Sequence, residues 1–261
     1  MVLFKHEMKQ SVTMLSIWTI VISFMLAVCV LIYPEMKSQM NEISSVFSEM
    51  GNFSAAFGMD QINFGEFMGY FGVECGNVLG MGGAFFAALI GVSALVKEEK
   101  ERTSEFLLAH PISRRQVVLE KFLAVLVQIL VLNVVVAAAT FLSVLLVGES
   151  PEWGKMALLF LVYLFLQIQI AFVCFGISAF LQRGGLGIGL GLAAMLYFLN
   201  IIANLTEQAE FLKYFTPFGY ANSALIMAEG RIDIKLLLVG ALFAVAGIAM
   251  SFFHYCKKDI S

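Results

Sequence analysis

The sequence predicts an all-α integral membrane protein with six transmembrane helices. Of its 261 residues, 60% are hydrophobic and 13% are charged, against roughly 45–50% and 25% in average proteins. The apolar residues form runs of about 20 or more, the length at which a helix crosses a bilayer core. Because these runs do not alternate with polar residues, they do not fit a transmembrane β-barrel.

The runs indicate a single membrane domain over residues 1–261. The first run is too long for the hydrophobic region of a signal peptide and has no small-residue cleavage site at its end, so we expect it to be retained. The expected spans are Thr13–Tyr33, Phe67–Val96, Val118–Val147, Met156–Leu181, Leu186–Leu205 and Ile234–Tyr255.

Three segments outside the spans have recognisable patterns. Met1–Gln10 combines apolar residues with Lys5 and Lys9, which is typical of an amphipathic interfacial helix leading into the first span. Pro34–Glu66 is a long polar loop with helical spacing in part. Thr206–Asp233 contains a Pro-Phe-Gly turn signal and predicts a broken external segment between the fifth and sixth spans.

The orientation follows from the lysines and arginines, which concentrate in cytoplasmic loops. With the N-terminus inside, eleven of them are cytoplasmic and five are external, so both termini are expected in the cytoplasm. The cytoplasmic set is Lys5, Lys9, Lys97, Lys100, Arg102, Arg114, Arg115, Lys121, Arg183, Lys257 and Lys258, and the external set is Lys37, Lys155, Lys213, Arg231 and Lys235.

Glycines recur at every fourth position in two spans, a spacing that lets helices approach closely. The positions are Gly72, Gly76 and Gly80 in the second span, and Gly187 and Gly191 in the fifth. The four cysteines lie in or beside apolar runs, so we expect them to be buried hydrophobes and expect no metal site.

The charged segment between the second and third spans also contains large apolar residues. Thr103 or Ser104 can cap a short helix over Glu105–Ala109, and Pro111 ends it. Ser113 and Gln116 form a capping box for the third span. From the residues alone, this short helix fits either a groove on another protein or the lipid headgroups.

This segment resembles the cytoplasmic signature of ABC-2 type transporter permeases, roughly E-x-x-T-x-E-x-L-L-x-x-P-I-S-R. Residues that match it are Thr103, Glu105, Leu107, Leu108, Pro111, Ile112, Ser113 and Arg114. The leading acid does not match, because Lys100 stands at that position between Glu99 and Glu101. The six-span layout and the broken external segment are also similar to this family.

The resemblance implies that the short helix is a coupling helix, which docks on a separate ATPase subunit. It further implies two permease chains on two ATPase chains, in the plasma membrane, with ATP and Mg²⁺ bound by the ATPase. The implied ATPase-coupling residues are Glu101, Thr103, Glu105, Phe106, Leu107, Leu108, Pro111, Ser113 and Arg114.

The chain itself lacks the motifs of an enzyme. A nucleotide-binding P-loop needs G-x-x-x-x-G-K-[ST], and no such run occurs. The three histidines form no H-E-x-x-H zinc motif, and Thr103 stands where an E-E-x-x-x-R membrane protease needs arginine. We therefore expect no catalytic activity, no cofactor and no nucleic-acid partner for this chain.

Polar residues inside the spans are the candidates for a substrate path, because they are costly in lipid and face protein or water. The alternative is hydrogen bonding between helices. Gln167 and Gln169 are two residues apart, so they point to different sides of one helix. The candidates are Glu74, Asn77, Gln128, Asn133, Gln167, Gln169 and Asn200, with Asn204 one turn beyond.

These features together predict the permease subunit of an ATP-driven exporter. Spans without a charged cluster suit an amphipathic cargo, and chain size and an acidic exterior are similar to permeases for amphipathic peptides such as phenol-soluble modulins. A drug exporter and a lipid or glycan exporter remain alternatives. A membrane channel or sensor component without an ATP-driven cycle is the alternative from a different class.

Overall fold

The computed structural model describes residues 2–49, 65–97, 113–181 and 185–257, and every regular element among them is helical. Six helical stretches in these ranges are long and apolar enough to cross a membrane. The predicted all-α membrane fold with six spans is therefore confirmed.

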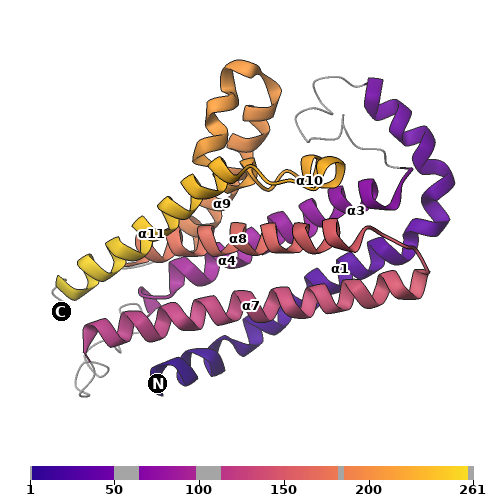
Figure 1. Cartoon of the computed structure of the whole chain (residues 1–261). Helices are drawn as coiled ribbons and strands as arrows, with labels where there is room; N and C mark the ends of the chain where they lie inside the picture. The colour runs from indigo at the N-terminus through magenta and orange to yellow at the C-terminus, as the bar shows by residue number, and fades with distance from the viewer. Residues whose placement is uncertain (1, 50–64, 98–112, 182–184, 258–261) are drawn as a thin grey trace.

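The first helix is much longer than the predicted first span. Helix α1 runs from Val2 to Glu49, so the amphipathic N-terminal segment and part of the predicted loop belong to the same helix. Pro34 lies inside α1. Because proline lacks an N–H and crowds the preceding turn, it bends a helix without necessarily ending it. Figure 1 shows the ribbon changing direction in the second half of α1.

The second span combines two geometries. It consists of α3 (Phe67–Cys75), the π-helix η1 (Gly76–Met81) and α4 (Gly82–Ser93), which follow one another without a loop. A Cβ atom at Gly76 would lie 3.0 Å from the Tyr163 hydroxyl, and one at Gly80 would lie 2.8 Å from the Tyr163 ring. The predicted close approach at these glycines is confirmed.

The remaining spans agree with prediction to within a few residues. They are α7 (Arg114–Val147), α8 (Trp153–Ser178), α9 (Leu186–Leu205) and α11 (Ile234–Lys257). Helix α7 ends at Gly148, whose φ of 74° is left-handed and favours glycine at a helix C-terminus.

The predicted broken segment between the fifth and sixth spans is present. It consists of the 3₁₀ helices η2 (Glu207–Phe215) and η3 (Pro217–Gly219) and the short helix α10 (Ser223–Glu229). Thr216 holds the corner, because its hydroxyl donates to the Leu196 carbonyl at 2.8 Å and accepts from the Phe218 N–H.

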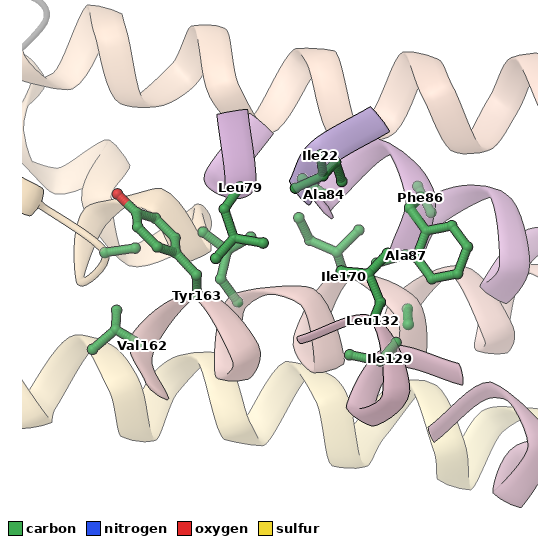
Figure 2. Packing of buried hydrophobic residues seen from close by; sticks show 14 of the residues in the cluster. Ile22, Leu79, Ala84, Phe86, Ala87, Ile129, Leu132, Val162, Tyr163 and Ile170 are labelled. Atoms are coloured by element: carbon green, nitrogen blue, oxygen red, sulfur yellow. The ribbon is translucent and has the colours of Figure 1, made fainter. Parts of the chain in front are cut away.

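The helices form a bundle in which α4 and α8 are the most buried and α1, α9 and α11 are peripheral. Helix α1 lies along α7, and α8 contacts both α4 and α11 (Figure 1). Leu79 and Ala87 of the second span and Ile170 of α8 belong to the buried core, together with Ile129 and Leu132 of α7 (Figure 2). The start of α1 and the end of α11 lie at the same end of the bundle (Figure 1).

The glycine prediction for the fifth span was wrong. Within the described part of the chain, a Cβ placed at Gly187 or Gly191 meets no other side chain or helix within 4 Å. The close approach to α4 occurs at Gly185 and Gly189, where a Cβ at Gly189 would lie 2.9 Å from the Ala88 carbonyl oxygen. Both pairs have the same spacing, but a shift of two residues turns the glycines to a different side of the helix.

Candidate functional site

Most of the predicted ATPase-coupling residues lie outside the described part of the chain. Glu101, Thr103, Glu105, Phe106, Leu107, Leu108 and Pro111 lie outside the described residues. Ser113 and Arg114 lie inside them, at the start of α7. The coupling role of the whole set stays a prediction.

Ser113 caps α7 as predicted, but the reciprocal bond from the Gln116 side chain, which a complete capping box needs, is not formed. The Ser113 hydroxyl oxygen accepts from the Gln116 N–H at 3.2 Å, which satisfies one of the unpaired donors in the first turn. The Gln116 side chain turns along the helix and donates to the Glu120 carboxylate at 2.9 Å. The cap therefore fixes where α7 begins, at the end of the bundle that holds the start of α1.

A buried ion pair joins three helical segments near this end. The Lys121 ammonium lies 2.8 Å from the Glu7 carboxylate of α1 and 2.7 Å from the carbonyl oxygen of Ala94, just after α4. The Lys121 residue is only 1% exposed. A cation so deeply buried is stable only with partners of this kind, so this contact ties α1, the end of α4 and α7 together.

The neighbouring residue makes a second link between α1 and α7. The Glu120 carboxylate accepts from the backbone N–H of Phe4 at 2.9 Å. This N–H belongs to the first turn of α1, where donors have no partner within the helix and where the helix dipole favours an acid. The N-terminal segment is therefore fixed on α7 by two adjacent side chains, Glu120 and Lys121.

Sequence reasoning missed this cluster. Lys121 was counted only as a cytoplasmic cation, and Glu7 and Glu120 were not singled out. A signal was present, because Val117, Lys121, Ala124 and Gln128 follow helical spacing and are all buried. A lysine within an otherwise apolar stripe indicates a buried partner.

A cavity of about 450 Å³ lies beside the ion pair. Its walls come from α1, the end of α4, α7 and the start of α9, and they combine charged, polar and apolar side chains. The lining residues are Glu7, Gln10, Ser11, Met14, Ile90, Ser93, Ala94, Val96, Lys97, Lys121, Ala124, Val125, Gln128, Gly185, Leu186 and Gly187.

Gln128 is a predicted path residue that lines this cavity. Its side-chain N–H donates to the Ala124 carbonyl oxygen of the preceding turn at 3.1 Å. Its side-chain oxygen is buried and has no hydrogen-bond partner among the residues that the structure describes. Because this oxygen has essentially no accessible surface, the unpaired acceptor lies behind the cavity wall.

Two other predicted path residues form a polar bridge in the core. Asn133 of α7 donates to the Gln167 side-chain oxygen of α8 at 2.6 Å. Gln167 in turn donates to the Leu79 carbonyl oxygen in η1 at 3.4 Å. This bridge joins α7, α8 and the π-helical turn. Asn133 and Gln167 therefore make the hydrogen bonds between helices that the sequence analysis gave as the alternative to lining a substrate path.

Gln169 faces a different side of α8, as its spacing from Gln167 predicts. Its side-chain oxygen accepts from the Tyr220 hydroxyl at 2.8 Å. Burial raises the pKa of Tyr220, so this hydroxyl keeps its proton and remains the donor. The bond fastens the broken segment between α9 and α11 onto α8.

The remaining candidates do not join these groups. Glu74 is half-buried and accepts from the Cys29 thiol at 3.6 Å, while Asn77 in η1 is exposed. Asn200 and Asn204 are half-buried on α9. Within the described ranges, no group of three His, Cys, Asp or Glu side chains is arranged to hold a metal ion.

Comparison with known families gives one match. Residues 1–260 match a family model described as ABC-2 family transporter protein. No curated protein matches the sequence. The family match covers all six candidate spans and the polar groups between them, so it concerns the whole chain and not one motif.

Proposed function

The chain belongs to the ABC-2 family of transporter proteins and is therefore a membrane permease component, and we propose that it exports an amphipathic cargo, with a peptide favoured. The observation that carries the proposal is the family match over the whole chain. The cavity beside the Lys121–Glu7 pair supports the amphipathic cargo, because its walls are charged in one part and apolar in another.

ATP-driven export needs a motor, which we assign to a separate ABC ATPase that binds ATP and Mg²⁺. The segment between Lys97 and Ser113 is its proposed attachment site. Lys121 links α7 to the Ala94 carbonyl oxygen, three residues before Lys97. A displacement of the attachment segment would therefore reach the end of α4 and the start of α7 together.

A second permease chain, identical or related, completes the proposed transporter. The peripheral helices support this, because α1, α9 and α11 expose large apolar side chains such as Phe24, Phe198 and Leu242. In the plasma membrane these faces would contact lipid and the second chain. Both termini would lie in the cytoplasm, beside the ATPases, which agrees with their position at one end of the bundle (Figure 1).

Reconstitution tests this function directly. The chain is co-purified with an ABC ATPase of the same organism, placed in liposomes, and supplied with ATP and fluorescent amphipathic peptides. We expect ATP-dependent peptide transport and peptide-stimulated ATP hydrolysis. The double variant Glu105→Lys, Leu107→Asp should insert normally but lose both activities, because it removes the acid and an apolar residue of the coupling helix.

The control is Glu210→Lys in η2, which makes the same charge change on an exposed residue outside the proposed attachment segment. It should transport normally. Normal transport by the coupling-helix variant would contradict its docking role. Failure to form any complex with the ATPase would favour a channel or sensor component, and stimulation by drugs or glycans alone would exclude the peptide.

A further inference from the structure

The second span has one side that the described helices leave uncovered. Asn77 is the single exposed residue between Phe67 and Ser93, and half-buried residues continue from it at helical spacing. The uncovered side is polar in the half of the span that begins at Phe67 and apolar in its middle. Its half-buried members include Glu74, Met81, Phe85 and Leu89.

This side of the span leads to the cavity of about 450 Å³. Leu89 is followed one turn later by Ser93, which lines the cavity together with residues of α1 and α9. Asn77 lies about 24 Å from Ser93 along the helix at 1.5 Å per residue. A molecule that leaves the cavity along this side therefore passes apolar side chains before it reaches Asn77 and Glu74.

Glu74 is a charged residue at the depth of the membrane core. The span has 27 residues and is about 40 Å long, so it extends about 5 Å beyond each side of a core of about 30 Å. Glu74 lies about 10 Å from Phe67 along the helix and so falls inside the core. A charge at this depth is costly unless a partner compensates it. The acid of α1, Glu7, has such a partner in Lys121 at 2.8 Å.

This chain offers Glu74 no cation. Among the described residues its carboxylate accepts only from the Cys29 thiol at 3.6 Å, which is a weak and neutral donor. Residues 38–64, whose side chains lie mostly outside the description, contain no lysine, arginine or histidine. The other undescribed stretches follow α4, α8 and α11 at the opposite end of the bundle (Figure 1). A cation for this carboxylate must therefore come from another molecule.

From the uncovered side and the unmatched carboxylate together, we infer that Glu74 binds the ammonium group of a cationic amphipathic peptide. The carboxylate accepts from the ammonium, the Asn77 side-chain oxygen is a neighbouring acceptor, and the apolar part of the peptide contacts Met81 and Phe85. Hydrogen bonds between two charged groups are stronger than those between neutral groups. The inference rests on the proposed function in treating the peptide as cargo, and it adds a preference for positive charge.

Binding to the purified full-length permease in nanodiscs of zwitterionic lipid, without any ATPase, tests the site. The probes are a short apolar peptide amide with a free N-terminal amine and the same peptide with an acetylated N-terminus. Because the C-terminus is amidated in both, the amine is the single charge. We expect the free amine to bind at least about tenfold more tightly, the effect of one hydrogen bond to a charged group.

Two variants assign the contacts. Glu74→Gln removes the charge but keeps an oxygen for the Cys29 thiol, so it should bring the free amine down to the affinity of the acetylated peptide. Asn77→Leu should weaken binding of the free amine alone. Asn77 is exposed, so its variant keeps the test valid if Glu74→Gln fails to fold.

The matched controls change exposed residues of the same types. Glu66→Gln removes an acid at the start of α3, and Gln208→Leu replaces an amide in η2. Both should leave binding unchanged. Equal binding of the two peptides to the wild-type chain would overturn the inference, as would no binding of either or an unchanged preference in Glu74→Gln.

A second permease chain is the competing partner for the carboxylate, through the exposed Arg231 or Lys235. Conversion of a permease dimer into monomers by Glu74→Gln and by Arg231→Gln or Lys235→Gln would assign Glu74 to that contact and overturn the peptide site. Preferential binding of the amine without any stimulation of the partner ATPase would keep the site but count against the peptide as cargo. Equal transport of both peptides would keep the proposed function and overturn the site.

Discussion

The Lys121 ammonium lies 2.7 Å from the backbone carbonyl oxygen of Ala94. This bond crosses from α7 to the residue that follows α4, where the last carbonyl groups of a helix have no partner within the helix. The same ammonium holds Glu7 of α1. One side chain on α7 therefore determines how three spans meet beside the segment proposed to contact the ATPase.

Replacing this lysine should be costly. In Lys121→Met the Glu7 carboxylate stays buried without a cation, which typically costs about 3–5 kcal/mol of folding free energy. The double variant Glu7→Leu, Lys121→Met should recover most of this loss, because no buried charge remains. Unfolding of each variant in mixed detergent micelles measures the difference.

The exchanged pair Glu7→Lys, Lys121→Glu provides a control for geometry. It restores opposite charges but places a carboxylate against the Ala94 carbonyl oxygen, so it should remain less stable than the apolar double variant. A Lys121→Met protein as stable as the wild type would show that the ion pair does not hold the helices.

The Asn133–Gln167 bond should appear as an energetic coupling. In a double-mutant cycle with Asn133→Leu and Gln167→Leu, we expect a coupling between about 0.6 kcal/mol, the average for hydrogen bonds within membranes, and about 1.7 kcal/mol, the largest value found. The control cycle pairs Asn133 with Gln169, which bonds to Tyr220 elsewhere, and should show no coupling. Equal couplings in the two cycles would contradict the assigned bridge.

Glycines in similar helices should differ in their tolerance of alanine. A Cβ at Gly91 would collide with the backbone carbonyl of Ala171 in α8, whereas one at Gly191 meets no atom within 4 Å. We expect Gly91→Ala to lose about 1–3 kcal/mol of stability through overpacking, and Gly191→Ala to stay within about 0.5 kcal/mol of the wild type. Thermal unfolding of the purified variants compares them, and equal losses would refute the close α4–α8 contact.

Thiol labelling tests the orientation. Ser44 lies in the C-terminal part of α1, and Ser113 is exposed at the opposite end of the bundle, before α7. In a background without native cysteines, Ser44→Cys should react with an impermeant reagent added outside cells. Ser113→Cys should react only after permeabilisation. The reverse pattern would place both termini outside.

The fold was largely predictable because apolar run length is a direct requirement of the bilayer. The fifth span, Leu186–Leu205, agrees with its prediction at both ends. The continuity of α1 was not predictable, since Pro34 and the polar residues after it favour a helix end in sequence terms. The structure shows that the helix continues past Pro34 to Glu49.

The candidate site was only partly predictable. Helical spacing gave the different directions of Gln167 and Gln169, but it could not identify Asn133 and Tyr220 as their partners. A sequence period fixes where a side chain points relative to its own helix axis and not which helix lies there. The same limit hid the Lys121–Glu7 pair, whose members are separated by the first two spans.

The π-helical turn η1 changes the helix geometry in the middle of the second span, between α3 and α4. Each residue turns an α-helix by about 100°, so the wider turn offsets the side chains after η1 from those before it. The α3 half contacts α1 and α10, and the α4 half contacts α8 and α9. The two halves of one span thus pack mainly against different helices, and the angle between their faces depends on the single π-helical turn that contains Asn77.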